Sequence, residues 1–256
     1  MGLFDKKFCD VCGEKIGLLG NKKLEDGNLC KACASKLSPW FSERRHSTLA
    51  DIKAQLDYRE ANKAEVAAFH TTRTLGNTTK VLLDEDQRKF MVTSARNLAE
   101  ANPDVMSYAD VTGCELRIDE RQVEQKRKDK DGNEVSYVPP RYSYEYDFNI
   151  EIRVNNPYFD EINFRLNPSS IEIEPAPAMP GRAAAAVNPM RSVAYADYKR
   201  MGEEIRDTLL QARQGVRDDI AAAAAPKTAV ICPCCGATTM PDANGCCEYC
   251  GSALKG

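Results

Sequence analysis

Closely spaced pairs of cysteines at the two ends of the chain decide how those ends fold. The N-terminal set reads Cys9-Asp10-Val11-Cys12-Gly13, and seventeen residues separate Cys12 from Cys30-Lys31-Ala32-Cys33. The C-terminal set reads Cys232-Pro233-Cys234-Cys235-Gly236 and then Cys246-Cys247-Glu248-Tyr249-Cys250-Gly251. Two residues between paired cysteines let both sulfurs point at one ion from a single tight turn. This spacing is typical of four-thiolate zinc sites.

The distribution of cysteines favours metal binding over disulfide bonds. Ten of the eleven cysteines lie in the two terminal segments, whereas disulfides of a secreted protein are usually spread along the chain. Met1–Lys7 contains no apolar stretch of the kind that marks a secretory signal. No transmembrane run is present in the sequence. We therefore expect a cytoplasmic protein whose thiols stay reduced and bind metal.

The N-terminal pairs predict a zinc finger of the treble-clef type. Its ligands are Cys9, Cys12, Cys30 and Cys33. Gly13 can adopt a positive φ, which lets backbone amides approach the sulfurs. The second pair is expected to lead into a short helix over Ala34–Trp40, whose N-terminal amides would stabilise thiolate charge.

Six C-terminal cysteines compete for four ligand positions. The pattern Cys-x-x-Cys-Gly selects Cys232, Cys235, Cys247 and Cys250, and it leaves Cys234 and Cys246 as spare thiols. Ligation by Cys234 or Cys246 stays open as an alternative, although one-residue spacing fits a metal knuckle poorly. The expected product is a zinc ribbon. A structural site uses all four tetrahedral positions, so both Zn²⁺ ions are expected to serve folding rather than catalysis.

The region between the two cysteine segments has a mixed helix and strand pattern. A helix is predicted over residues 46–69, with Thr48 as its N-cap and Asp51 completing a capping box. From Thr79 the hydrophobic period changes to two and continues to Glu174, with clear alternation in Tyr142–Val154. Arg121–Asn133 is predicted to be a solvated charged loop that ends in a turn at Asp131-Gly132-Asn133. These patterns favour an antiparallel sheet or small barrel.

A second helix is predicted over Val193–Asp218, after a Pro- and Ala-rich linker at residues 175–189. The apolar stripe of this helix is expected to pack against the sheet. The predicted class is α+β, with a small antiparallel β-barrel capped by a C-terminal helix and flanked by the two zinc modules. The expected divisions are residues 1–45 (finger), 46–74 (linking helix), 75–218 (barrel and capping helix) and 219–256 (linker and ribbon).

No catalytic constellation is apparent in the sequence. Gly-rich phosphate-binding loops are missing, and the two histidines, His46 and His70, are scattered. Cys114 lies alone in a strand pattern, where a buried apolar thiol is expected. The net charge of −3 argues against a dedicated nucleic-acid binder, which usually has a basic excess. We therefore expect a protein that is not an enzyme.

The residues around the first cysteines resemble an uncharacterised bacterial family, found mainly in Gram-positive bacteria, whose N-terminal zinc finger has no known function. The resemblance covers about residues 8–60 and rests on the Cys9 and Cys30 pairs together with Lys15–Gly20, Lys23-Leu24 and Asp26-Gly27. The middle region is similar in strand order to bacterial pleckstrin-homology-like (PH-like) domains, and the tail to short zinc ribbons. Together these resemblances imply a binding protein or adaptor and supply no catalytic residues.

The function expected from the sequence is that of a cytoplasmic adaptor that binds another protein. Two alternatives remain: nucleic-acid binding through the zinc modules, and binding of anionic lipid by the PH-like domain. The sequence leaves the partner and the oligomeric state open.

Overall fold

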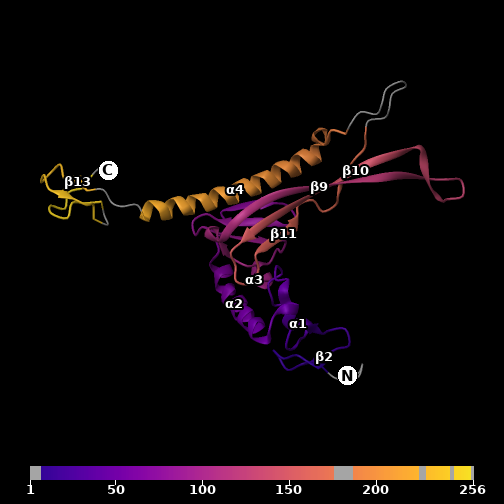
Figure 1. Ribbon diagram of the computed structural model, residues 1–256, viewed down its shortest axis with the longest axis horizontal. Coiled ribbons are helices and arrows are strands. Elements are labelled where there is room, and N and C mark those ends of the chain that lie inside the picture. Colours follow the sequence, from indigo (N-terminus) through magenta and orange to yellow (C-terminus); the bar gives the residue numbers. More distant parts are fainter. Residues whose placement is uncertain (1–6, 176–186, 225–228, 243–244, 255–256) are drawn as a thin grey trace. The chain divides into compact units, whose positions relative to one another are not determined.

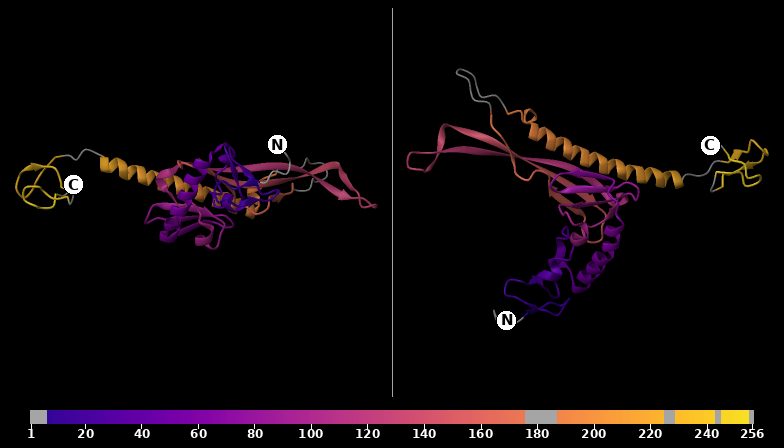
Figure 2. Two further views of the ribbon diagram at one scale, coloured as in Figure 1. Left: turned by 90° about the horizontal axis from the view of Figure 1, so that it is seen from below. Right: turned by 180° about the vertical axis from the view of Figure 1, so that it is seen from behind.

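A computed structural model describes residues 7–175, 187–224, 229–242 and 245–254 (Figures 1 and 2). The chain divides into two compact units, Met1–Arg213 and Gln214–Gly256. Most of the linker expected at residues 175–189 lies outside the described residues.

The finger at the start of the first unit consists of very short elements. β1 (Lys7–Phe8) pairs with β2 (Lys15–Ile16), and β3 (Lys22–Lys23) pairs with β4 (Asn28–Leu29). A single helical turn, α1 (Lys31–Ala34), and a 3₁₀ turn, η1 (Glu43–His46), follow. The core is small and includes two of the cysteines; its buried members are Cys9, Ile16, Leu24, Leu29, Cys33, Leu37 and Ile52.

Helix α2 (Leu49–Ala68) connects the finger to the first sheet. The predicted capping box is confirmed: the Thr48 side chain accepts from the Asp51 N–H, and the Asp51 carboxylate accepts from the Thr48 N–H at 2.9 Å. Ile52 of the first turns belongs to the finger core, with Leu49 and Leu56 packed against that core. The first half of α2 is therefore part of the finger.

The first sheet has the order β5-β6-β7-β8, and every pair is antiparallel. Its strands are β5 (Arg73–Gly76), β6 (Lys80–Asp84), β7 (Lys89–Thr93) and β8 (Met106–Ser107). The strand pattern that begins at Thr79 starts with β6 and β7, which pair as an antiparallel hairpin. A helical turn, α3 (Leu98–Ala101), connects β7 to β8, and a 3₁₀ turn, η2 (Tyr108–Asp110), leads out of β8.

The second sheet is built around one long strand, β10 (Glu134–Val154). One edge of β10 pairs with β9 (Val111–Lys128), and the other edge pairs with β11 (Glu161–Arg165) and β12 (Ile171–Ile173). The alternation predicted for the second half of β10 is confirmed, because Tyr146, Phe148, Ile150, Ile152 and Val154 are all buried.

The charged stretch after Glu120 is not the predicted loop. β9 continues to Lys128, and only the turn around Gly132 (φ 86°) connects it to β10. Backbone pairing with β10 and cross-strand ion pairs such as Arg121–Glu145 sustain this extension. Its side chains are mostly exposed, so the alternation that marks a half-buried strand is missing there.

The expected closed barrel is also wrong. Among the described residues the strands of the middle region form two open antiparallel sheets, and no strand pair joins them. A barrel requires its edge strands to pair with each other. Here β10 is long enough to hold three partners by itself, and the first sheet pairs only within itself. The mixed class with antiparallel sheets and two four-cysteine clusters is confirmed.

Helix α4 (Val193–Ala224) packs on the second sheet through aromatic contacts. The ring centroid of Tyr195 lies 5.0 Å from the centroids of both Tyr146 and Phe148. Gly202 lies so close to Leu116 that an added Cβ would stand 2.5 Å from Leu116 Cδ1. The predicted packing of the helix is therefore confirmed, while the helix extends past the predicted end at Asp218. A 3₁₀ turn, η3 (Pro189–Arg191), precedes it.

The second unit holds a small module after the end of α4. β13 (Val230–Ile231) pairs with β14 (Thr238–Thr239), and Pro241 and Cys247 form an isolated bridge. Its buried hydrophobic residues are Cys232, Cys247 and Leu254, and Thr239 is buried as well. Across the described part of the whole chain, no helix has the length and apolar character needed to cross a membrane.

Candidate metal centres

The four predicted N-terminal thiols lie together. The sulfurs of Cys9, Cys12, Cys30 and Cys33 are all within 4.8 Å of one another, and the Cys12 and Cys30 Sγ atoms are 3.8 Å apart. Four sulfurs at about 2.3 Å from one tetrahedral ion stand about 3.8 Å from each other. The cluster therefore has the size that a four-thiolate metal site requires.

The first cysteine pair is held by a tight turn. The Gly13 N–H donates to the Cys9 carbonyl at 2.7 Å, and the Cys9 N–H donates to the Glu14 carbonyl at 2.8 Å. Gly13 has the predicted positive φ, 75°, which is costly for a residue with a Cβ. This turn brings Cys9 and Cys12 to the same point.

The second pair lies at the start of α1. Cys30 is the N-cap of this helical turn, and its sulfur accepts from the Cys33 N–H at 3.3 Å. The expected helix over Ala34–Trp40 is wrong in its bounds: the turn begins at Lys31 and ends at Ala34. The capping sulfur explains the shift, because it starts the helix directly after Cys30.

The C-terminal cluster has two turns of the same kind instead of one turn and a helix. Its members are Cys232, Cys235, Cys247 and Cys250, whose sulfurs lie within 4.8 Å of one another. The Sγ atoms of Cys232 and Cys250 are 3.6 Å apart, and those of Cys235 and Cys247 are 3.7 Å apart. These separations again match one tetrahedral ion.

Each turn repeats the backbone pattern of the N-terminal one. The Gly236 N–H donates to the Cys232 carbonyl at 2.9 Å, and the Gly251 N–H donates to the Cys247 carbonyl at 2.8 Å. Both glycines have a positive φ, 70° for Gly236 and 71° for Gly251. The second unit thus presents its four sulfurs from two equivalent turns.

Electrostatics single out one readily ionised thiol in each cluster. Burial opposes ionisation of Cys9, but backbone N–H groups, including that of Cys30 at 3.3 Å, lower its pKa to about 6. Burial and the neighbouring thiols raise the pKa of Cys33. A cation bound among the sulfurs would remove this mutual repulsion, so metal binding and thiol ionisation are coupled.

The thiols of the C-terminal cluster also differ in their pKa values. The hydroxyl and backbone N–H of Ser252 lower the pKa of Cys250 to about 6. The backbone N–H of Ala237 favours the Cys235 thiolate, but the Cys250 thiol and desolvation raise its pKa to about 12.

The remaining cysteines and the histidines lie outside both clusters. Cys234 is exposed and Cys246 is partly buried, and neither belongs to the set of converging sulfurs. Cys114 is buried as expected, and burial raises the pKa of its thiol to about 12. His46 and His70 are exposed. Metal ligation by the eight clustered cysteines stays a prediction that the geometry permits.

A buried polar junction beside the finger could not be recognised in the sequence. Arg59 of α2 donates to the Asp104 carboxylate at 2.7 Å, and the two side chains are 7% and 0% exposed. The other Asp104 oxygen accepts from the Ser38 hydroxyl at 2.8 Å, and Arg59 Nε donates to the Lys36 carbonyl at 3.3 Å. Residues of the finger, α2 and the loop before β8 therefore meet at one ion pair.

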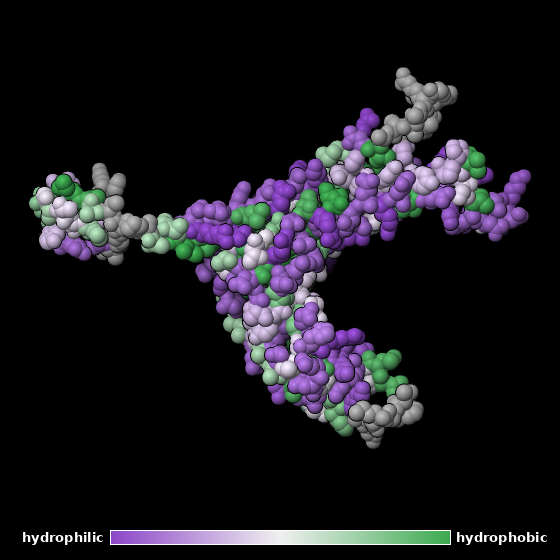
Figure 3. Space-filling model, in the orientation of Figure 1, coloured by the Kyte–Doolittle hydropathy of each residue, from purple (hydrophilic) through white to green (hydrophobic). Residues whose placement is uncertain are grey.

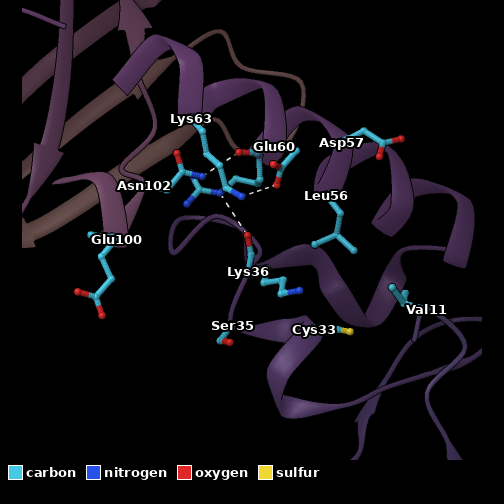
Figure 4. Close-up of a pocket in the computed structure, with 12 residues that line it drawn as sticks. Val11, Cys33, Ser35, Lys36, Leu56, Asp57, Glu60, Lys63, Glu100 and Asn102 are labelled. Atoms are coloured by element: carbon cyan, nitrogen blue, oxygen red, sulfur yellow. Dashed lines mark hydrogen bonds and ion pairs between the residues drawn. The ribbon is translucent and has the colours of Figure 1, made fainter. Parts of the chain in front are cut away.

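An open cleft of about 520 Å³ lies along this junction (Figure 4). Arg59 and the exposed pair Lys63–Glu60 form part of its wall, together with Asn102, whose side chain donates to the Arg59 carbonyl at 2.8 Å. The charged lining is balanced, with Lys36, Arg59 and Lys63 against Asp57, Glu60 and Glu100. The Arg59 side chain is already occupied by Asp104 and the Lys36 carbonyl.

Comparison with known proteins gives a result only for the N-terminus. A family model described as a domain of unknown function, DUF4428, matches residues 7–55, which span the finger and the first turns of α2. Comparison with the curated proteins and with the solved structures gives no match. The match confirms that the N-terminal residues resemble a domain family of unknown function, and it extends over the residues that share the finger core.

Proposed function

We propose that the protein is a zinc-binding cytoplasmic adaptor that docks on another protein through its C-terminal ribbon. The observation that carries the proposal is the exposure of three large apolar side chains in that module. Ile231, Met240 and Tyr249 are 72%, 53% and 73% exposed, although the module is very small. Large apolar side chains, Tyr and Met in particular, are enriched at protein interfaces.

Zinc is the metal proposed for both clusters. Four thiolates in a tetrahedral set suit Zn²⁺, and such closed sites are structural. Among the described residues, the hydrophobic core of the C-terminal module consists of Cys232, Cys247 and Leu254, which is too small a core to fold by hydrophobic burial. Metal binding is worth on the order of 10–16 kcal/mol in small zinc modules and would supply the missing stability. In this account zinc holds the apolar side chains in place for the partner.

The middle region is proposed to keep the PH-like arrangement in an open form. The order of a four-stranded antiparallel sheet, a second antiparallel sheet and a packed helix supports this proposal. No ligand is assigned to this region, because fold alone does not specify one.

Affinity capture from the native cell, followed by protein identification, tests the docking role. The full chain is compared with the double variant Ile231→Ser/Tyr249→Ser and with Cys235→Ser. We expect both variants to lose the same partner, because one removes apolar contacts and the other removes the metal that orders the module. Val138→Ser is the matched control, since Val138 is 95% exposed on β10 and outside the ribbon.

The control should retain the partner fully. Capture of the same proteins by all four forms would contradict the docking role. Capture of nucleic acid instead, with retention that falls steeply as salt rises, would favour the nucleic-acid alternative.

A further inference from the structure

A tight turn of the finger presents two leucines to solvent. The Gly20 N–H donates to the Gly17 carbonyl at 2.9 Å, so Leu18 and Leu19 occupy the two central positions of the turn. Their side chains are 90% and 87% exposed. Figure 3 shows hydrophobic residues gathered at the end of the finger, next to hydrophilic surface. Two adjacent leucines at the apex of a turn protrude, whereas a core or a peptide groove would enclose them.

A cationic cleft begins directly after this turn. It measures about 550 Å³ and is lined by Asn21, Lys22, Lys23, Leu24, Glu25, Arg44 and Arg45. Four of these side chains are cationic and one is anionic, which gives a formal charge of +3 in a chain whose net charge is −3. Within the described part of the chain, none of the four cations forms an ion pair with a carboxylate. The cleft thus concentrates positive charge on an otherwise acidic protein.

The leucine turn and the cleft belong to one continuous surface. Lys22 follows Leu19 by three residues, so their Cα atoms are at most about 11 Å apart. The Arg44 guanidinium donates to the Lys23 carbonyl, and the Glu25 N–H donates to the Ser47 carbonyl at 3.0 Å. These bonds tie η1 to the strand that follows the turn. The position of the cations relative to the leucines is therefore set by the finger's own fold.

We propose that the finger binds the surface of an anionic membrane. The protruding leucines would enter the boundary between headgroups and acyl chains, while Lys22, Lys23, Arg44 and Arg45 would contact headgroup phosphates. Apolar insertion combined with attraction between basic side chains and anionic lipids is the usual basis of peripheral membrane binding. The protruding shape of the apolar pair favours a membrane over an acidic peptide, which would need an apolar groove. This role is independent of the docking surface on the C-terminal ribbon.

Co-sedimentation of the full, metal-loaded chain with lipid vesicles tests the proposal. We expect binding to phosphatidylcholine vesicles that contain phosphatidylglycerol, little binding to pure phosphatidylcholine, and weaker binding at high salt. The variants Leu18→Ser/Leu19→Ser and Lys22→Glu/Arg45→Glu should each bind at least about tenfold more weakly. Their metal content and thermal midpoint should not change, because all four side chains are exposed.

Two control variants make the same kinds of substitution, charge reversal and loss of an apolar side chain, outside the finger. Lys126→Glu/Arg127→Glu reverses two exposed charges on β9, and Val138→Ser removes an exposed apolar side chain from β10. Both should bind vesicles as the parent chain does, and inorganic phosphate should not displace the parent chain. The proposal is overturned if the parent chain does not bind anionic vesicles, or if Lys126→Glu/Arg127→Glu loses as much binding as Lys22→Glu/Arg45→Glu. It is also overturned if free phosphate or RNA binds the cleft in place of vesicles.

The ribbon variant Ile231→Ser/Tyr249→Ser keeps the two proposals apart. It should lose the protein partner and still bind vesicles. Loss of vesicle binding in this variant, with retention in Leu18→Ser/Leu19→Ser, would place membrane contact outside the finger and overturn the inference.

Discussion

Three glycines set the shape of the turns that carry six of the eight clustered cysteines. Gly13, Gly236 and Gly251 have φ values of 75°, 70° and 71°. An added Cβ would meet no atom within 4 Å at any of the three positions, so side-chain crowding does not require glycine there. The backbone conformation does require it, because a residue with a Cβ adopts the left-handed region at a cost of about 1–2 kcal/mol.

Gly236→Ala should therefore weaken metal binding without blocking the site. The strain should lower the metal affinity of the C-terminal cluster about tenfold, which a competition titration with a chromophoric chelator would measure. Gly215→Ala is the matched control, since Gly215 lies in α4 with a negative φ and open space around it. Alanine is favourable in a helix, so this control should bind metal normally. Equal affinity of both variants would show that the left-handed turn is not needed.

Features that depend on neighbours in the chain could be predicted from the sequence. The cysteine pairs, the Thr48–Asp51 capping box and the turn at Asp131-Gly132-Asn133 each involve residues only a few positions apart. The last is stabilised by Asp129, whose carboxylate accepts from the Asp131 and Asn133 N–H groups at 2.9 Å. Such features depend on short stretches of sequence, and tertiary packing does not override them.

The two halves of helix α2 bury side chains of different chemistry. Its first half adds apolar side chains to the finger core, and its second half places polar side chains in a buried junction. There, Asn62 donates to the Pro103 carbonyl at 2.8 Å and accepts from the Val105 N–H at 3.0 Å. Arg59 neutralises Asp104 in the same place. The helix thus fixes the finger to the loop that precedes β8.

Arg59→Met should destabilise the first unit by about 3–5 kcal/mol, because it leaves the Asp104 carboxylate buried without its cation. Urea denaturation would measure this loss. Lys63→Ala removes an exposed ion pair on the same helix and should cost at most about 0.5 kcal/mol. Comparable losses in the two variants would contradict the buried junction.

The Arg59→Met deficit should also depend on pH. Burial raises the pKa of Asp104 even with Arg59 and Ser38 beside it, and without Arg59 the pKa should rise further. A carboxyl whose folded pKa exceeds its unfolded value binds protons more readily in the folded state. Its stability contribution is therefore lost as pH rises. The unfolded pKa is common to both proteins, so the deficit should begin to grow only when pH rises through the folded pKa that Asp104 has in the parent, which lies above its ordinary value of about 4. Denaturation at several pH values would measure this, and a constant deficit would argue against a buried carboxylate.

Elements that depend on distant partners were predicted less well. Arg59 and Asp104 resemble ordinary surface charges in the sequence, and only folding brings them together. β9 was expected to end at Glu120, because the pairing that continues it to Lys128 comes from β10 and its exposed side chains carry no alternation. The prediction of a closed barrel was wrong for the same reason, since the pairing of sheet edges is a long-range property that strand patterns do not encode.

The finger is an integral part of the first unit rather than an appendage. Cys9 and Cys33 are buried in the core that includes Ile52 of α2, and Ser38 reaches the buried carboxylate of Asp104. Loss of the metal proposed for the N-terminal cluster would therefore loosen both the finger core and the junction. The C-terminal cluster belongs to the other unit and should lack this effect.

Cys33→Ser should destabilise the first turns of α2 as well as the finger. Hydrogen exchange of the amides in residues 49–56 should accelerate at least about tenfold, because their packing partners would lose the proposed metal site. Cys235→Ser removes one clustered cysteine from the other unit and should leave these amides unchanged. If Cys33→Ser left α2 fully protected, the finger would be an independent module.

The central claim is that the chain holds two structural zinc ions, one in each four-cysteine cluster. Elemental analysis of the purified, reduced protein tests this claim most directly. We predict two zinc equivalents for the parent chain and for Cys234→Ser and Cys246→Ser, and one equivalent for Cys235→Ser. One or no equivalent in the parent chain would contradict the claim, and two equivalents in Cys235→Ser would show that the C-terminal ligands are chosen wrongly.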